Sequence, residues 1–505
     1  MEIELKLLVA PEHLAWLEQH PALTQVMRRR LRKQPLRTVY FDTPDFDLAQ
    51  AGVALRLRQE GSQWTQTLKG NGSSAGGLHV RDELEWKLPN SSPDLVVLDS
   101  TPYRDLFARS GVSGRLTPVF TTEFDRAARV LAFPDGTAAE LAIDRGAIRA
   151  GNRRVPISEV ELELKSGDPQ RLFELAREIA RDVPVHVGHA SKAERGYALA
   201  RGAAPAPPQK ARSILLAESL TAGAALSKIA VACVVQMQAN EEGVIAGRDP
   251  EYLHQFRVGL RRLRSALGLI RLTVGREWER PLAKRLRWLQ NALGPARDWD
   301  VFVDDTLRKI EREQGEVRGR ASFRARCARL RRMHMEEARV ALRSPRYTAI
   351  CLALGQRFGC ERDLQEPALQ APVADFAAFV LDKCDRGLRK YGGDLAQATP
   401  ERRHAARIAA KKLRYASEFF ASLYPRERVA PYVDALERLQ DILGAMNDAA
   451  TVGRLLGEIA ATAKRGVAPQ VDNVVRSEVA ARAARELVGY GAAWRKFEKL
   501  NPFWQ

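Results

Sequence analysis

The sequence predicts an α+β region at the N-terminus and an all-α region after it. Residues 1–200 alternate apolar and polar side chains over short stretches such as "ISEVELELKSG" (157–167), separated by Gly, Pro and Asp turn signals. From about residue 213 the apolar spacing is helical almost throughout. We therefore expect a mainly antiparallel sheet or barrel with packed helices in residues 1–200 and a helical domain in residues 213–505. Residues 201–212, "RGAAPAPPQKAR", are rich in Ala and Pro and predict the linker between them.

The helical region contains an internal repeat. The segment "HQFRVGLRRLRSALGLI" begins at His254, and "HAARIAAKKLRYASEFF" begins 150 residues later at His404. A second pair, "LRWLQNALGPARDWDVF" from Leu286 and "LERLQDILGAMNDAATV" from Leu436, has the same offset. Because two separate motifs share one offset, the sequence predicts a duplicated helical unit, with copies in residues 213–345 and 373–505.

The excess positive charge lies in the second region. Residues 1–200 carry 27 basic and 27 acidic side chains, so the whole net charge of +18 arises after residue 200. Such a field attracts polyanions, which include nucleic acid, an anionic membrane and polyphosphate. Composition alone does not choose among them.

Three features predict a cytoplasmic protein. Charged residues begin at Glu2 and no apolar h-region follows, so we expect no signal peptide. No run of about 18 apolar residues is present, so we expect no membrane span. The five cysteines show no metal-ligand spacing and are expected to be reduced thiols.

Acidic and basic side chains share single faces of the predicted strands. The pattern Glu-x-Glu-x-Lys occurs three times, beginning at Glu2, Glu83 and Glu161, and side chains at i and i+2 of a strand point the same way. One such strand is usually a solvated face. Several together predict a barrel whose polar face lines a water-filled lumen. Carboxylates would hold Mg²⁺ there while Arg and Lys bind phosphate oxygens, so a metal–polyphosphate ligand satisfies both sets of charges.

These residues resemble the CYTH superfamily, the triphosphate tunnel metalloenzymes. The N-terminal signature of that superfamily is matched by Glu2, Glu4 and Lys6. Further matching pieces follow in order: "VYFDTPDFDL", Arg56 and Arg58, Lys69 in "QTLKG", Glu83 and Glu85, Arg126, Asp144 in "IDRG", Glu159 and Glu161, and Lys192 in "SKAERGY". The resemblance implies an eight-stranded tunnel that binds triphosphates and hydrolyses them with Mg²⁺ or Mn²⁺.

The resemblance and the chemistry of the side chains together suggest roles. We expect metal ligation by Glu2, Glu4, Asp144, Glu159 and Glu161, and phosphate binding by Arg56, Arg58, Lys69, Arg126 and Lys192. Glu4 and Lys6 are the expected catalytic residues, with Lys6 either on phosphate or orienting the attacking water. A carboxylate-held metal can activate that water for in-line attack. Glu159, Glu161 and Glu163 share one face, so the pattern leaves open the choice among them and the number of ions.

Two helices of the second region carry matching basic stripes. At about 100° per residue, His254, Arg257, Arg261 and Arg264 fall within roughly 80° of one another, and Arg262 flanks them. His404, Arg407, Lys411 and Arg414 repeat the stripe, flanked by Lys412. One such helix is commonly a solvated amphipathic face, but these stripes are nearly free of acids and occur twice. Together with "LQNALGPARD" and "LQDILGAMND", they resemble the CHAD domain, which implies two similar helical bundles that bind inorganic polyphosphate.

Polyphosphate fits the stripes better than nucleic acid, because nucleic-acid binders add aromatic stacking platforms among the cations. The combination of regions resembles bacterial CYTH–CHAD inorganic triphosphatases, which implies hydrolysis of inorganic triphosphate to pyrophosphate and phosphate. The alternatives are a CYTH-type adenylate cyclase, a thiamine or nucleoside triphosphatase, and a non-catalytic scaffold of polyphosphate granules. The sequence leaves open the physiological triphosphate, the oligomeric state, and whether the helical domain regulates the tunnel.

Overall fold

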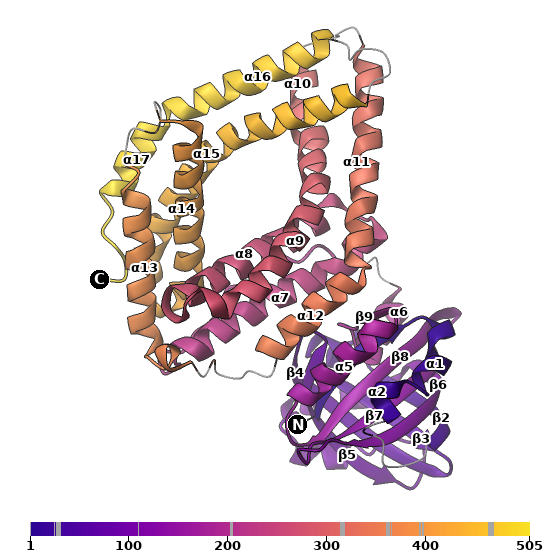
Figure 1. The fold of residues 1–505 in the computed structure, drawn as a ribbon. Coiled ribbons are helices and arrows are strands. Elements are labelled where there is room, and N and C mark those ends of the chain that lie inside the picture. Colours follow the sequence, from indigo (N-terminus) through magenta and orange to yellow (C-terminus); the bar gives the residue numbers. More distant parts are fainter. Residues whose placement is uncertain are drawn as a thin grey trace. The chain divides into compact units, whose positions relative to one another are not determined.

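The computed structural model describes residues 2–24, 26, 32–109, 111–202, 206–313, 319–359, 364, 366–392, 395, 398–462 and 469–505. The contacts divide the chain into two compact units (Figure 1). The barrel unit comprises residues 1–207 and 343–360, and the helical unit comprises residues 208–342 and 361–505. The bounds of the linker and of the two repeat copies stay predictions.

The barrel unit is built on strands from the first third of the chain. They are β1 (Glu2–Val9), β2 (Arg32–Asp42), β3 (Ala54–Glu60), β4 (Gln63–Ala75), β5 (Leu78–Leu88), β6 (Thr117–Ala132), β7 (Ala138–Ala150), β8 (Arg153–Ser166) and β9 (Val185–Val187). Their order is β5-β4-β3-β2-β6-β7-β8-β1, and β1 pairs again with β5, which closes eight antiparallel strands into a barrel. The ninth strand, β9, pairs with residues 7–9 at the C-terminal end of β1, whereas β5 pairs with residues 2–5 of β1. The predicted barrel of eight antiparallel strands is confirmed.

Helices cover part of the barrel. They are α1 (Leu14–Leu17), α2 (Pro21–Thr24), α3 (Asp47–Gln50), α4 (Arg104–Ala108), α5 (Gln170–Asp182), α6 (Lys192–Arg201) and α12 (Pro345–Phe358). Helix α5 is amphipathic, buries Leu172, Phe173 and Ile179, and contacts β1, β8 and α12. Beneath such helices the strands keep an apolar outer face: Leu5 and Leu7 of β1 are 0% exposed. The charged residues of the same strand alternate with these leucines and so face the lumen.

Helix α12 belongs to the barrel unit although it lies far along the sequence. It contacts α5, β4 and β9, and its side chains Ile350 and Leu352 are 0% exposed. From the sequence, residues 345–358 are predicted to belong to the helical domain, because their apolar spacing is helical. Apolar spacing identifies a buried helix face but does not identify the surface on which that face packs.

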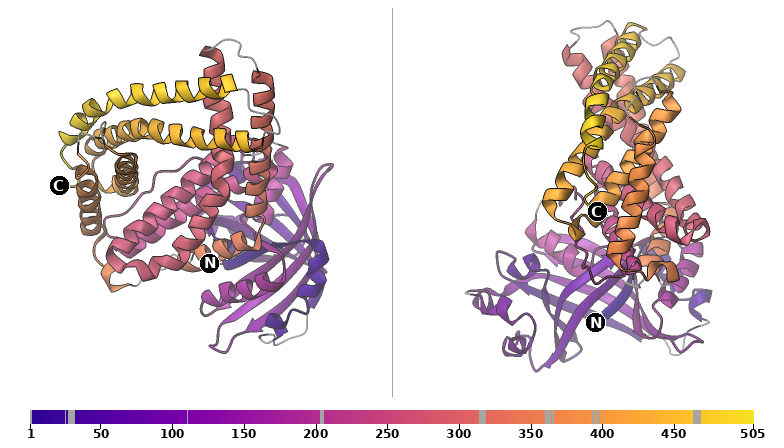
Figure 2. Two further views of the ribbon diagram at one scale, coloured as in Figure 1. Left: turned by 45° about the horizontal axis from the view of Figure 1, so that its top comes forward. Right: turned by 90° about the vertical axis from the view of Figure 1, so that its left-hand side faces the viewer.

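The helical unit contains α7 (Ala222–Ala246), α8 (Pro250–Val274), α9 (Arg276–Val301), α10 (Arg308–Glu313), α11 (Arg320–Leu342), α13 (Val373–Arg389), α14 (Pro400–Phe420), α15 (Arg426–Ala461), α16 (Pro469–Val488) and α17 (Tyr490–Glu498). Long helices run side by side in the pairs α7–α8, α8–α9, α14–α15 and α15–α16 (Figure 2). The predicted all-α architecture of this part of the chain is confirmed.

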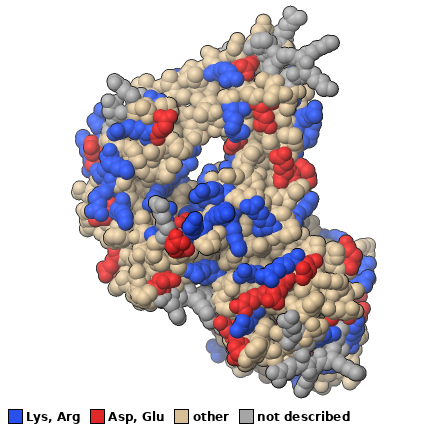
Figure 3. Space-filling view, viewed as in Figure 1, with Lys and Arg blue, Asp and Glu red and all other residues tan. Residues whose placement is uncertain are grey.

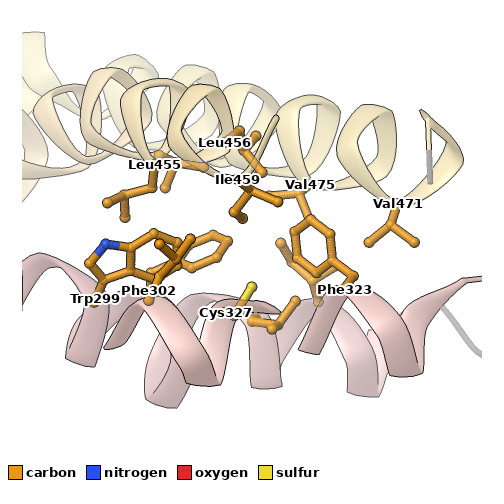
Figure 4. Close-up of a cluster of buried hydrophobic side chains, with 13 residues drawn as sticks. Trp299, Phe302, Phe323, Cys327, Leu455, Leu456, Ile459, Val471 and Val475 are labelled. Atoms are coloured by element: carbon orange, nitrogen blue, oxygen red, sulfur yellow. The ribbon is translucent and has the colours of Figure 1, made fainter. Parts of the chain in front are cut away.

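A shared core joins the two halves of the helical unit (Figure 4). Trp299 of α9 and Phe323 of α11 pack toward Leu455 and Ile459 of α15 and Val475 of α16. These side chains are 0–2% exposed. The halves related by the sequence repeat are therefore not independent, because they bury one apolar cluster between them.

Helix α7 is long and apolar enough, by length and composition alone, to cross a membrane. Within the helical unit, however, 67% of its most apolar window is buried by other parts of the protein. A core helix of a soluble protein passes the same test, so the composition of α7 is weak evidence for a membrane span.

His334 of α11 forms a polar link beside this core. Its Nδ1 lies 2.7 Å from Glu337, and its Nε2 contacts Glu458 of α15, which also accepts a hydrogen bond from Trp299 Nε1. Burial alone would lower the pKa of His334, but the hydrogen bonds to Glu458 and Glu337 outweigh it and raise the pKa above its ordinary value. With a carboxylate on each ring nitrogen, the imidazolium form is the one that fits.

We predict that this link makes the stability of the helical unit pH-dependent. Because the folded-state pKa of His334 is raised, its contribution is complete below the unfolded value of about 6.5 and is lost as the pH rises through the folded value. His334→Gln should cost about 1–3 kcal/mol at low pH and less at high pH. Urea unfolding followed by circular dichroism at several pH values measures both effects. An equal loss of stability at every pH would contradict the prediction.

Candidate active site and polyanion-binding face

A charged cavity of about 620 Å³ lies inside the barrel, and strands β1–β8 and helix α6 contribute its walls. Among the described residues its acidic lining consists of Glu2, Glu4, Glu83, Glu85, Glu140, Glu161, Glu163 and Glu194. Its basic lining consists of Lys6, Arg56, Arg58, Lys69, Arg81, Arg126, Lys165 and Lys192. The two sets are equal in number, so the lining is balanced in charge as a whole.

Strand β1 places Glu2, Glu4 and Lys6 on the lumen face. Lys6 is paired in register with Glu161 of β8 and is 1% exposed. Its Nζ contacts Glu161, lies 3.2 Å from Glu159 Oε1 and lies 3.6 Å from Glu4 Oε1. Burial alone would lower the pKa of Lys6, but the three carboxylates outweigh burial and raise that pKa well above its ordinary value. Lys6 is therefore held as a cation.

Three buried carboxylates, which we call the inner acidic trio, gather behind Lys6. Oxygens of Asp144, Glu159 and Glu161 lie within 4.8 Å of one another. Lys192 Nζ lies 2.6–2.8 Å from an oxygen of each. Arg126 lies 2.7 Å from Asp144 and 2.6 Å from Glu161. Burial would raise the pKa of Glu159, but Lys192 and Lys6 outweigh it and lower the pKa to about 2.

Helix α6 fixes the cations that face the trio. Ser191 caps the helix and exchanges hydrogen bonds with Glu194 in a capping box, which places Lys192 at the first helical position. Arg195 follows three residues later on the same face, and its Nη1 lies 2.8 Å from Glu159 Oε2. Arg195 is not among the site residues predicted from the sequence, although its i,i+3 spacing from Lys192 is a signal for a shared target.

The predicted metal ligands separate into two groups. Asp144 and Glu159 are 0% exposed and do not line the cavity. Oxygens of all three carboxylates of the inner acidic trio, Glu161 included, already accept from lysine or arginine, so a metal ion bound by them would have to displace these cations. Glu2, Glu4 and Glu161 do line the cavity. Of the predicted carboxylates, these three are the ones placed to meet a metal ion carried in with a ligand.

A second acidic group, the outer acidic row, consists of Glu2, Glu4, Glu140 and Glu163. Glu4 is paired in register with Glu163, which is also paired with Glu140 of β7. Burial, followed by the carboxylates of Glu2 and Glu140, raises the pKa of Glu163 despite its 2.6 Å ion pair with Lys165. Crowded carboxylates of this kind suit a divalent cation. Glu140 was not predicted from the sequence. It lies four residues before Asp144 on β7, so the two side chains share one face of the strand, and that spacing could have identified it.

The predicted phosphate-binding cations differ in how well they are neutralised. Arg126 is fixed to the trio, and Arg56 Nη2 lies 3.1 Å from Glu83. Lys69 Nζ lies 2.6 Å from Glu2 and 3.1 Å from Glu83. Arg58 has no carboxylate partner within the described part of the chain. Burial and its neighbours Arg56 and Arg126 lower the pKa of Arg58 to about 10. An anion entering the cavity would relieve this repulsion.

In the helical unit, the repeat extends to single hydrogen bonds. Arg264 of α8 contacts Gln290 Oε1 of α9. Arg414 Nε of α14 lies 3.1 Å from Gln440 Oε1 of α15. Each residue of the second pair lies 150 residues after its counterpart in the first. The same side-chain contact is thus built twice.

The two basic stripes converge. Helices α8 and α14 contact each other, and Lys and Arg gather on the face of the helical unit where α8 and α9 run (Figure 3). Burial lowers the pKa of Lys411 to about 7, together with the positive charges of Arg407, Arg261 and Arg414. Burial and Arg261 likewise lower the pKa of Arg257 to about 10. Side chains from both stripes therefore feel each other's charge.

The histidines that begin the two stripes differ in their surroundings. Burial and the neighbouring Arg297 lower the pKa of His254 to about 4, whereas His404 is exposed. Asp298 and Asp448, which end the two repeated "LG" motifs, lie near the arginines. Burial raises the pKa of both carboxyl groups. Asp298 and Asp448 are fewer than the cations of the two stripes and do not neutralise them all.

Comparisons with known proteins agree with this division. Residues 1–197 match the model of the CYTH domain, and residues 228–457 match the model of the CHAD domain. The chain carries a CYTH domain followed by a CHAD domain. The match to the CHAD domain spans α12, which packs on the barrel.

Individual relatives are similar to different extents of the chain. An inorganic triphosphatase of Haemophilus influenzae is 37% identical over 200 residues, which are 39% of this chain and 54% of that protein. The chain thus spans about half the length of that relative. An uncharacterized protein of Mycobacterium tuberculosis is 28% identical over 405 residues, 76% of this chain and 75% of that one. The crystal structure of the CHAD domain from the plant Ricinus communis aligns with a TM-score of 0.52 at 32% identity, covering 58% of this chain and 97% of that chain.

Not every stripe residue of the CHAD domain faces outward. Arg262 is 4% exposed, donates to Gln236 at 3.0 Å and packs over an aromatic ring, so it has a packing role. Its counterpart Lys412 is half-buried. Arg414 forms an i,i+4 ion pair with Glu418. The stripes are thus nearly free of acids, as the sequence indicates, but Glu418 near the end of the second segment does form an i,i+4 pair with a stripe residue.

We predict that the inner acidic trio stabilises the CYTH domain. Glu159→Gln should lower the free energy of unfolding by about 3–5 kcal/mol, because it removes a buried charge that three cations, Lys6, Lys192 and Arg195, share. Since the folded pKa of Glu159 is about 2, its contribution is present above the unfolded value of about 4.3 and is lost as the pH falls toward about 2. Urea unfolding over this pH range measures it.

Glu123→Gln is the matched control, because Glu123 is an exposed carboxylate on β6 that pairs with Arg149 at 3.3 Å. Such a surface pair contributes about 1 kcal/mol or less. Equal destabilisation by the two variants would contradict the prediction.

Proposed function

We propose that the CYTH domain hydrolyses inorganic triphosphate to pyrophosphate and phosphate, with Mg²⁺ or Mn²⁺, in the barrel cavity. The observation that carries the proposal is the cavity lining, in which the described acidic and basic side chains are equal in number. A volume of about 620 Å³ is within the usual range of small-molecule sites. The similarity of residues in this domain to an inorganic triphosphatase supports the same substrate.

The outer acidic row and Glu161 would hold the metal. Glu2 and Glu4 project from one strand face, and Glu161 and Glu163 project from the adjacent strand. Carboxylate oxygens are the ligands that Mg²⁺ and Mn²⁺ prefer. When bound there, the metal supplies charge neutralisation at the phosphate and a more acidic water.

Arg58, Arg56 and Lys69 would bind the phosphate oxygens. Arg58 has its positive charge least neutralised, so a triphosphate gains most by pairing with it. Guanidinium groups bind phosphate oxygens through two parallel hydrogen bonds. These contacts would fix the chain of phosphates relative to the carboxylates on the opposite wall.

Lys6 would act as a fixed cation. Because neighbouring carboxylates raise its pKa, it is protonated at neutral pH and cannot accept a proton from water. It can donate a hydrogen bond to phosphate or to the attacking water, and its positive charge offsets charge that develops at the phosphorus. Lys192 and Arg126 keep the inner acidic trio neutralised behind it.

Loss of Glu4 tests the proposed hydrolysis. Glu4→Gln should lower kcat/KM for triphosphate about 100-fold or more, because it removes one expected metal ligand that acts in the transition state. Phosphate release is measured for the purified full chain with Mg²⁺ or Mn²⁺ and triphosphate, ATP, thiamine triphosphate or long polyphosphate. Glu123→Gln, outside the cavity, should keep full activity. No hydrolysis of any of these substrates, or full activity in Glu4→Gln, would overturn the proposal.

We also propose that the CHAD domain binds inorganic polyphosphate, and through it associates with polyphosphate granules. Arg257, Arg261, Arg407 and Lys411 are the core of the binding face, because their charges repel one another. A linear polyanion that bridges both stripes removes this repulsion and raises the lowered pKa values.

Lys411 gives this binding a pH signature. With its pKa at about 7 in the free protein, Lys411 must take up a proton when the polyanion binds. Affinity should therefore fall as the pH rises above about 7, by up to tenfold per pH unit. Calorimetric titration of the full chain with polyphosphate in buffers of different ionisation enthalpy measures the proton uptake.

Lys411→Arg is the matched variant, because it keeps the charge and removes the titration. It should bind polyphosphate with little pH dependence, whereas the double substitution Arg257→Glu and Arg407→Glu should abolish binding at moderate salt. Unchanged binding in that double variant, or tighter binding of single-stranded nucleic acid than of polyphosphate, would contradict the proposal.

A further inference from the structure

Helix α12 packs on the two segments that hold the backbone of Lys6. On one side, Lys6 N donates to Gly77 O at 3.1 Å. On the other side, Gly188 N donates to Lys6 O at 2.9 Å. Gly77 lies in the turn between β4 and β5, and Gly188 follows β9 directly. Lys6 is thus fixed between a hairpin turn and the segment that follows a short strand.

The hairpin turn meets α12 backbone to backbone. Gly76 and Gly77 both adopt left-handed φ values, of +62° and +82°, as two-residue hairpins with primed turns require. A Cβ atom on Gly76 would lie 2.3 Å from Gly355 Cα of α12. A Cβ atom on Gly355 would lie 2.6 Å from Phe173 Cε1 of α5 and 2.7 Å from Gly76 O. A Cβ atom on Gly77 would lie 2.1 Å from Val187 Cγ1 and 3.5 Å from Lys6 O. Two glycines in contact therefore let α12 approach the turn that bonds Lys6.

The β9 segment meets α12 through a buried hydrogen bond. Thr348 is 2% exposed, and its Oγ1 donates to Val185 O at 2.7 Å. Three residues later, Gly188 approaches Lys6 so closely that a Cβ atom there would lie 2.8 Å from Lys6 Cγ. Gln356 adds contacts to α5, at 2.9 Å from Gln170 Nε2 and 3.0 Å from Arg177 Nη1. Helix α12 is thus held to the barrel unit by specific polar contacts as well as by apolar burial.

We infer that α12 is a positioning element for Lys6. Gly355 and Thr348 hold the hairpin turn and the β9 segment, and these two segments fix the position of the Lys6 backbone in the barrel. None of the described residues of α12 lines the cavity, so any effect of α12 on Lys6 is indirect, and Gly77 and Gly188 are the residues that bond the Lys6 backbone. The catalytic part of the inference rests on the proposed triphosphatase function. The Lys6 side chain meets three carboxylates, and a small shift of its backbone would misplace the ammonium against all of them.

The test uses the full chain and two readouts. Gly355→Ala should lower kcat for triphosphate about tenfold while KM changes less than about twofold, because binding residues elsewhere in the cavity stay in place. Hydrogen exchange in peptides that contain Lys6 and Gly188 should become about tenfold faster, because their amides form the two bonds in question. Polyphosphate binding by the CHAD domain should stay unchanged.

Gly457→Ala is the matched control. Gly457 lies inside α15, and a Cβ atom there would meet nothing within 4 Å. The same substitution in a helix therefore tests propensity without a clash, and it should leave activity and exchange at Lys6 unchanged.

A milder pair of variants covers the case in which Gly355→Ala does not fold. Thr348→Val removes the hydrogen bond to Val185 O and should reproduce the faster exchange and lower kcat, whereas Thr348→Ser keeps the hydroxyl and should restore both. Wild-type exchange at Lys6 in folded Gly355→Ala and in Thr348→Val would overturn the inference, as would a lower kcat without faster exchange. If the unmodified chain hydrolyses no triphosphate, the proposed function fails, but the exchange experiment still decides whether α12 holds Lys6.

Discussion

Charge compensation inside the barrel is the constraint on which the rest of the structure depends. Burying Lys6, Glu159 and Asp144 at 0–1% exposure would cost several kcal/mol per ion if any of them lacked a partner. The structure meets this cost by bringing Lys192 to the same point from helix α6, which follows the barrel strands in the sequence. The cap of α6, the register of β1 against β8 and the closure of the barrel therefore serve one requirement, which is to bring opposite charges to hydrogen-bonding distance.

The CHAD domain applies the opposite arrangement. Its cations crowd one another, with Arg257 and Lys411 shifted toward their neutral forms by burial and by neighbouring arginines. A basic face of this kind stores repulsion that a bound polyanion would relieve. The CYTH cavity is different, because its lining already contains equal numbers of acids and bases. A ligand that contains both a metal ion and phosphate groups therefore suits the CYTH cavity, whereas a ligand of phosphate groups alone suits the basic face of the CHAD domain.

The sequence predicted the barrel, the helical region and most of the charged residues, because side-chain alternation and helical spacing are local signals. It could not rank Glu159, Glu161 and Glu163, which share one strand face. Their roles depend on depth in the barrel and on which cation from another element reaches each of them. Arg195 was missed for the same reason, since it acts on a strand 36 residues away. Arg262 was included in the binding stripe because spacing on a helix does not reveal which neighbour covers it.

Helix α12 shows most clearly what local patterns leave out. The two repeat copies predicted from the sequence end at residue 345 and resume at 373, and α12 (Pro345–Phe358) falls almost wholly in that gap. The gap was visible as a break in the repeat, but nothing in its composition named the barrel as its partner. The reason is physical: the contact is made by Gly76 and Gly355, whose importance lies in the absence of a side chain. A segment that interrupts a duplicated domain and folds with its neighbour ties the folding of that neighbour to a part of the chain that lies beyond residues 208–342 of the helical unit.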